Sequence, residues 1–221
     1  MMYTLSTFMP RTVPSPSRKR PARGYHHGDL KNALRMAASA LIAERGVESV
    51  SLREISQAAG VSHTAAYRHY ADKQALLADL AEDGFRQLAE VNRQTISTTP
   101  GGPVAQLMAC GRAYVRFGVQ RPHVLQLMFS QAIPDWTVHP SLQLASEELA
   151  RTLADVVSAG QAAGVMRPAP LGEVTLAAWS LVHGLAQLLA GRRIPAAVID
   201  EAFIEHMAEQ CVALLMRGLA R

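Results

Sequence analysis

Residues 51–70 read SLREISQAAGVSHTAAYRHY and carry the clearest local structural signals in this chain. Ser51 and Glu54 match the capping-box pattern, in which the two side chains satisfy free backbone amides at the start of a helix. Apolar residues then recur at three- and four-residue spacing, which predicts one apolar stripe along that helix. Gly60 supplies the backbone freedom to end it, and Ser62 is a favourable cap for a second helix. The stretch therefore predicts two short helices joined by a tight turn.

The second of these helices has two different faces. Ala65 and Ala66 are small, so the helix can lie close against its partner. The other face carries hydrogen-bond donors and stacking groups, namely His63, Thr64, Tyr67, Arg68 and His69. This is the layout of a helix-turn-helix motif, whose second helix presents its N-terminal residues to base edges in the major groove.

We expect this motif to contact double-stranded DNA. We expect base contacts from the start of the second helix, at His63, Thr64 and Ala65. The alanine methyl group can touch a thymine methyl group. Phosphate contacts and supporting positions are expected around them, at Ser51, Arg53, Ser62, Tyr67, His69 and Lys73. The lysine lies in the first turn of the following helix, where the helix dipole already favours an anion.

Residues 25–80 resemble the TetR family of transcriptional regulators. The similarity includes the segment YHHGDLKNALRMAASALIAERG, which precedes the motif. It also includes the spacing of Tyr67, His69, Tyr70 and Lys73, which is typical of that family.

The resemblance implies an all-α protein with two domains. Residues 25–72 would form an N-terminal three-helix, helix-turn-helix DNA-binding domain. Residues 73–221 would form a C-terminal helical domain that binds a small-molecule effector and dimerises. The resemblance also implies a homodimer that forms through the last two helices. It further implies a repressor that leaves a palindromic operator when its effector binds.

Composition agrees with a helical protein of 221 residues. Alanine and leucine abound, aromatic residues make up 5%, and no run of alternating β-branched residues predicts strands. We expect no membrane span, because no uninterrupted apolar run of about 18 residues is present, and no secretory signal. Cys110 and Cys211 are far apart in sequence, which favours buried thiols in a reducing, cytoplasmic setting.

The positive charge is concentrated in residues 1–24, which hold five basic and no acidic residues, whereas the net charge of the whole chain is +4. Four prolines in this segment and few apolar groups predict disorder. The segment is interpreted either as a basic arm that contacts DNA or as a solvated leader.

Long helices are expected on both sides of the motif. Apolar periodicity and breaks such as TTPGGP at 98–103 place them at 26–45, 72–97, 103–120, 122–131, 141–159, 171–190 and 196–219. Gly84 is expected to let the 72–97 helix bend, and Gly160 and Gly164 to end the 141–159 helix. The last two helices are apolar over wide faces, which fits a four-helix bundle between subunits, with Leu185 and Leu214 at the interface, or deeper burial within one subunit.

The effector site is predicted from composition. The middle helices and the loop after them supply adaptable and aromatic side chains: Met108, Tyr114, Phe117, Met128, Phe129 and Trp136. WSLVHG at 179–184 resembles the Trp-His-Gly signature of one type of TetR-family C-terminal domain. His183 is the candidate polar group for the effector, although a histidine among apolar residues more often has a structural role. These residues either line a pocket for a neutral, partly hydrophobic effector or simply fill the core.

No enzyme motif is recognised. The chain has no glycine-rich phosphate loop, zinc-ligand spacing or nucleophile elbow, so we expect no catalytic residues, no cofactor and no metal. The neighbouring His26, His27 and Asp29 do not form a metal-binding pattern. A helical carrier or an enzyme that happens to contain a helix-turn-helix-like pair remains the alternative.

Overall fold

The computed structural model describes residues 27–191 and 200–219, and every regular element within them is an α-helix. The helices are α1 (His27–Arg45), α2 (Leu52–Ala58), α3 (His63–Tyr67), α4 (Lys73–Thr98), α5 (Gly102–Gln120), α6 (Pro122–Met128), α7 (Pro140–Ala162), α8 (Leu171–Ala190) and α9 (Glu201–Leu219). The all-α prediction is confirmed. The predicted arm at 1–24 and the predicted start of the last helix at 196–199 lie outside the described residues.

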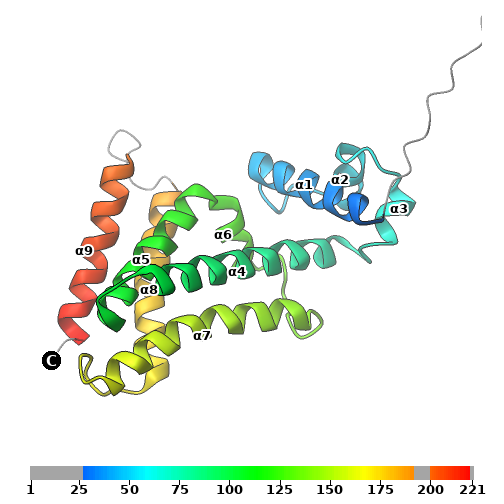
Figure 1. The fold of residues 1–221 in the computed structure, drawn as a ribbon. Helices are drawn as coiled ribbons and strands as arrows, with labels where there is room; N and C mark the ends of the chain where they lie inside the picture. Colours follow the sequence, from blue (N-terminus) through cyan, green and yellow to red (C-terminus); the bar gives the residue numbers. More distant parts are fainter. Residues whose placement is uncertain (1–26, 192–199, 220–221) are drawn as a thin grey trace, which may run out of the picture.

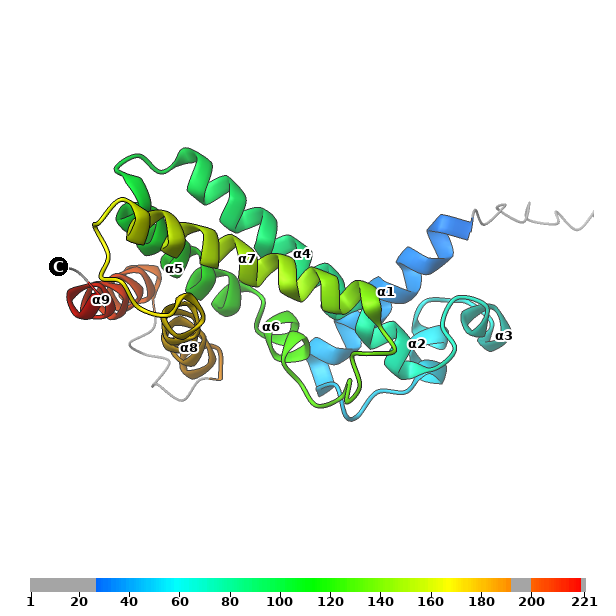
Figure 2. The ribbon, with the colours of Figure 1, turned by 90° about the horizontal axis from the view of Figure 1, so that it is seen from below.

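The helices are arranged along α4. Helices α1–α3 gather at one end of the molecule, and α4 runs from them into a bundle formed by α5–α9 (Figures 1 and 2). Helix α4 packs against α7, α5 and α6, while α5 packs against α8 and α9. The 26-residue α4 is therefore the element that connects the helix-turn-helix motif to the core of the bundle.

The local signals of residues 51–70 are confirmed. Ser51 Oγ accepts from the Glu54 amide at 3.3 Å, and Glu54 Oε2 accepts from the Ser51 amide at 2.9 Å. Gly60 has a φ of +67°, in the left-handed region that favours glycine. Ser62 Oγ accepts from the Ala65 amide at 3.2 Å. Each bond joins residues three positions apart, which is why sequence pattern alone predicts this turn.

Glycines in two long helices have roles that depend on packing. Gly84 lies inside α4 and is buried against α6, where a Cβ would come within 2.8 Å of Val124 Cγ1 and Met128 Sδ, so it allows close packing of the two helices. The prediction that Gly160 ends its helix is wrong, because it lies inside α7, close to Met166, and α7 continues to Ala162. Gly164, with a φ of +69°, follows the end of α7 as predicted.

Helix α8 is apolar on more than its core face. Among the described residues it is the one helix long and apolar enough to cross a bilayer by length and composition, although a soluble core helix passes the same test. It packs against α5, α7 and α9. Leu185, predicted at a subunit interface, is only 7% exposed and belongs to the core of its own subunit. Leu214, also predicted at the interface, is 62% exposed, and Leu188, a member of the predicted apolar face of α8, is 51% exposed.

Candidate DNA-binding surface and effector cavity

Helix α3 presents an exposed polar face. His63, Thr64 and Tyr67 are exposed, whereas Ala66 is fully buried against the rest of the motif. The His63 and Tyr67 rings meet edge to face, with centroids 4.7 Å apart. This contact holds two predicted DNA-binding side chains on the same exposed face, and the half-buried Ala65 lies beside them.

The other predicted DNA-binding residues surround this face but differ in availability. Arg53 on α2 is exposed, and Lys73 begins α4, which Asp72 caps through the Ala75 amide at 2.8 Å. The Ser51 hydroxyl donates to Glu54 Oε2 at 2.7 Å, and Ser62 caps α3, so both serines act first as helix caps. His69 is half-buried. Exposed Arg68 at the end of α3 is a further cation near this surface that was not included among the predicted contacts.

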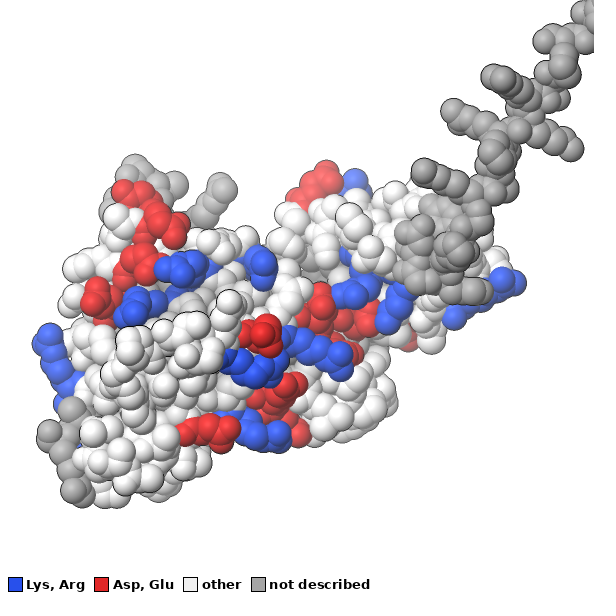
Figure 3. Space-filling view, viewed as in Figure 1, with Lys and Arg blue, Asp and Glu red and all other residues white. Residues whose placement is uncertain are grey.

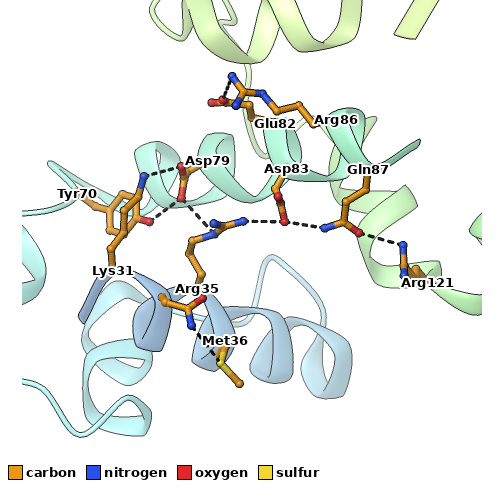
Figure 4. Close-up of polar contacts among 11 residues, drawn as sticks. Lys31, Arg35, Met36, Tyr70, Asp79, Glu82, Asp83, Arg86, Gln87 and Arg121 are labelled. Atoms are coloured by element: carbon orange, nitrogen blue, oxygen red, sulfur yellow. Dashed lines mark hydrogen bonds and ion pairs between the residues drawn. The ribbon is translucent and has the colours of Figure 1, made fainter. Parts of the chain in front are cut away.

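The motif is fastened to α4 by a polar cluster that the sequence pattern does not reveal (Figure 4). The Tyr70 hydroxyl donates to Asp79 Oδ2 at 2.7 Å, and Lys31 Nζ donates to Asp79 Oδ1 at 2.9 Å. Arg35 on α1 pairs with Asp79 at 3.4 Å and with Asp83 at 2.7 Å. Burial, together with the hydrogen bond to Asp79, holds the pKa of Tyr70 well above its ordinary value, so the ring is a neutral donor.

The polar cluster continues along α4 toward the bundle. Gln87 Nε2 donates to Asp83 Oδ2 at 2.7 Å, and Arg121 Nη1 donates to Gln87 Oε1 at 2.9 Å (Figure 4). Arg121 lies at the junction of α5 and α6. Positive and negative side chains are accordingly interspersed along the boundary between α1–α3 and the bundle (Figure 3).

A cavity of about 470 Å³ opens between α4, α5, α7 and α8. Its volume lies within the range of small-molecule sites. It is lined by Phe85, Asn92, Tyr114, Phe129, Ser146, Leu149, Ala150, Arg151, Leu153, Ala154, Leu171, Gly172, Thr175, Leu176 and Trp179. The lining is largely apolar, and its one charged side chain belongs to Arg151, which is exposed.

Two of the predicted effector contacts, Tyr114 and Phe129, line this cavity. The others lie outside its lining: Met108, Phe117, Met128, Trp136 and His183. Most have other packing roles. Met128 is fully buried and packs at Gly84, and the Trp136 ring lies against Phe85 at 5.6 Å.

The contributions of α7 and of two polar residues to the cavity are not evident from the sequence. Asn92 on α4 is 5% exposed, and its Oδ1 has no hydrogen-bond partner among the described residues. Thr175 Oγ1 on α8 is likewise buried without a partner there. Unpaired buried polar atoms are rare, and two of them in the lining of one cavity suit it to a ligand with polar groups.

His183 lies behind the lining. Its Nδ1 is 2.8 Å from the Tyr114 hydroxyl, and its ring stacks on Phe129 at 4.6 Å and Trp179 at 5.2 Å. Burial lowers the pKa of His183, so the neutral ring is favoured. Its position supports Tyr114, which does line the cavity. No cluster of three or more potential metal ligands occurs in the part of the chain that the structure describes.

Comparison with known proteins matches both halves of the chain. Residues 34–80 match the family model described as bacterial regulatory proteins, tetR family, and residues 107–211 match a tetracyclin repressor-like C-terminal domain. The HTH-type transcriptional regulator AcrR of Shigella flexneri is 36% identical over 67 residues, which cover 30% of this chain and 31% of that protein. The chain thus spans about a third of that curated relative.

Solved structures share the whole fold. A protein with unknown function from Rhodococcus sp. RHA1 is 30% identical, with a TM-score of 0.75, over 90% of this chain and 100% of that one. AibR, solved in complex with isovaleryl coenzyme A and operator DNA, is 20% identical, with a TM-score of 0.68, over 85% of this chain and 98% of that one. With both halves matched in sequence and the fold matched throughout, the chain belongs to the TetR family of bacterial regulatory proteins.

Proposed function

We propose that this chain is a cytoplasmic, ligand-responsive transcriptional repressor. A homodimer binds a palindromic operator and leaves it when a small effector fills the cavity. One observation carries this proposal: a single helix, α4, begins at Lys73, just after the turn that follows α3, and lines the cavity with Phe85 and Asn92 further along. Residues 25–72 would bind DNA, and residues 73–221 would bind the effector and dimerise.

The coupling would work through the position of α4. The protein would have two conformations that differ in the position of α4. An effector that binds one conformation more tightly shifts the equilibrium toward that conformation, and the ratio of its two affinities limits the size of the shift. Moving α4 changes the separation of the two α3 helices in a dimer. Operator half-sites lie a fixed helical repeat apart, so a small change in separation weakens contacts at both. AibR, which shares the fold and was solved with both an acyl coenzyme A and operator DNA, supports this kind of function.

The proposed DNA contacts divide by type. His63, Thr64 and Ala65 would touch base edges, while Tyr67, His69 and Lys73 would position phosphates. Arg53 would contact phosphate from α2, and Ser51 and Ser62 would contribute through the helices they cap. The exposure of Arg53 on α2 and of the side chains of α3 at 63, 64 and 67 supports this assignment.

Operator binding can be tested by fluorescence anisotropy with the DNA upstream of the protein's own gene, over a range of salt concentrations. We expect Lys73→Ala to weaken binding to all DNA sequences about equally. It should also reduce the slope of log affinity against log salt concentration by about one, because one fewer counterion is released. His63→Ala should instead change base preference. Arg167→Ala, which removes an exposed charge from the segment after α7, is the matched control and should leave binding unchanged. Binding without salt dependence, or unaffected by Lys73→Ala and Tyr67→Phe, would favour a carrier or enzyme instead.

The proposed homodimer is supported by exposed leucines on the last two helices. Leu188 on α8 and Leu214 on α9 present large apolar side chains to solvent, and burying them between subunits would remove that surface from water. We expect Leu188→Glu and Leu214→Glu to give folded monomers by light scattering. Leu144→Glu on α7, a leucine that is 65% exposed, is the matched control and should remain a dimer. Leu185→Glu would disrupt the core of one subunit, so it does not test the interface.

A further inference from the structure

Two residues with buried polar groups lie where the effector cavity meets a second, smaller cavity of about 30 Å³. The two cavities share Asn92, Tyr114, Leu153 and Trp179 in their linings. The rest of the large cavity is mainly aromatic and aliphatic, and its other polar residues are Ser146, Arg151 and Thr175. The orientation of the Asn92 amide and of the Tyr114 hydroxyl therefore determines which polar group a ligand can place there.

The hydrogen bonds of Thr152 set the orientation of Asn92. The Thr152 hydroxyl donates its one proton to the Leu149 carbonyl at 2.7 Å, so its oxygen must accept from Asn92, at 3.2 Å. The amide nitrogen of Asn92 consequently faces Thr152. Its Oδ1 is then left as a buried acceptor with no partner among the described residues.

A chain of donors sets the orientation of Tyr114. Trp179 Nε1 can only donate, and it does so to the Tyr114 oxygen at 3.2 Å. The Gln187 amide nitrogen lies 3.4 Å from His183 Nε2, and with this nitrogen as donor the His183 proton is assigned to Nδ1, which lies 2.8 Å from the Tyr114 oxygen. In this tautomer the Tyr114 oxygen accepts twice. Its own proton remains available for a third partner.

We propose that the effector carries an uncharged head group that both donates and accepts a hydrogen bond, such as a hydroxyl or a primary amide. The head group donates to Asn92 Oδ1 and accepts from the Tyr114 hydroxyl. An apolar body extends over Phe85, Phe129 and Leu149. This inference rests on the proposed function, in which the cavity is the effector site.

A carboxylate head group fits this position poorly. It can only accept, so it would leave Asn92 Oδ1 unpaired and would place its charge near another acceptor. Burying an unpaired charge is strongly unfavourable. Arg151, the one charged residue of the lining, is exposed on α7 and offers a carboxylate a competing position at the surface.

Three probes with the same ten-carbon chain test the head group: decan-1-ol, decanamide and decanoate. Binding to the full chain is measured by calorimetry at pH 8, where decanoate is ionised. We expect decan-1-ol and decanamide to bind at least tenfold more tightly than decanoate. Tyr114→Phe and Asn92→Leu should each reduce that preference to about threefold or less. Leu176→Ala, which shortens an apolar lining residue, is the matched control and should weaken all three probes by a similar factor.

Several results would overturn the proposal. The first is binding of decanoate that is as tight as, or tighter than, binding of the uncharged probes. The second is a tenfold preference for the uncharged probes that persists in both variants, and the third is the absence of binding by all three probes. If Asn92→Leu fails to fold, Tyr114→Phe alone decides, because it removes one hydroxyl from an otherwise unchanged ring. Operator binding by the ligand-free protein is measured in parallel. If the ligand-free protein binds the operator but the probes do not bind as expected, the head-group proposal fails and the proposed regulatory function stands. If the probes bind as expected but the operator is not bound, the proposed function fails and the cavity remains a ligand site.

Discussion

The hydrogen bond between Tyr70 and Asp79 should be a main fastening of the helix-turn-helix motif to α4. The Tyr70 side chain is 4% exposed and donates to a carboxylate at 2.7 Å. A hydrogen bond to a charged group contributes about 1.5–3 kcal/mol to stability. The ion pair of Asp79 with Lys31, whose side chain is nearly half exposed, contributes only about 0–1 kcal/mol. The tyrosine bond should therefore outweigh the lysine pair.

A double-mutant cycle isolates this bond. Unfolding free energies of wild type, Tyr70→Phe, Asp79→Ala and the double variant are measured by urea denaturation. We expect Tyr70→Phe to lower the unfolding free energy by about 1.5–3 kcal/mol in the wild type and by much less when Asp79 is already absent. The coupling energy should then be about 1.5 kcal/mol or more.

Asp83→Ala is the control for this cycle. Asp83 also pairs with Arg35, at 2.7 Å, but its side chain is 42% exposed, so its removal should cost less than about 1 kcal/mol. A coupling energy below about 0.5 kcal/mol, within the usual error of additivity, would refute the assignment of Tyr70. So would an equal cost for Asp83→Ala and Asp79→Ala.

Two further predictions concern pH and close packing. Burial lowers the pKa of His183 and of His123 below the ordinary value of 6.5, so below that pH the unfolded chain binds protons that the folded protein does not. The unfolding free energy should therefore fall as the pH drops from about 6.5 through the lowered pKa values of the folded state. His183→Asn should make this fall shallower in urea titrations at about pH 5–8. A Cβ at Gly111 would lie 2.5 Å from Val212 Cγ2. Gly111→Ala should therefore lower the unfolding free energy by up to about 2 kcal/mol, because overpacking costs about 1–3 kcal/mol and the gain in helix propensity returns about 1 kcal/mol. Adding Val212→Ala should lessen the cost of Gly111→Ala, and an unchanged cost in that background would show that α5 and α9 are not tightly packed there.

The helix-turn-helix motif and the helical class can be predicted without knowledge of the tertiary structure. Ser51, Glu54, Gly60 and Ser62 act on backbone groups within a few residues, so their effect does not depend on the rest of the fold. The apolar stripes of the long helices likewise follow from local periodicity. Such signals predict where helices begin and end to within a few residues.

The tertiary structure alone decided the cavity lining and the faces of the closing helices. The lining brings together Asn92 from α4, Tyr114 from α5 and Thr175 from α8, and no local spacing relates residues that far apart. Leu185 and Leu188 are three residues apart on a helix that is apolar nearly all round, yet one is buried and the other exposed. Periodicity cannot orient a helix that lacks a polar face, because only its packing against α5, α7 and α9 sets which side is covered.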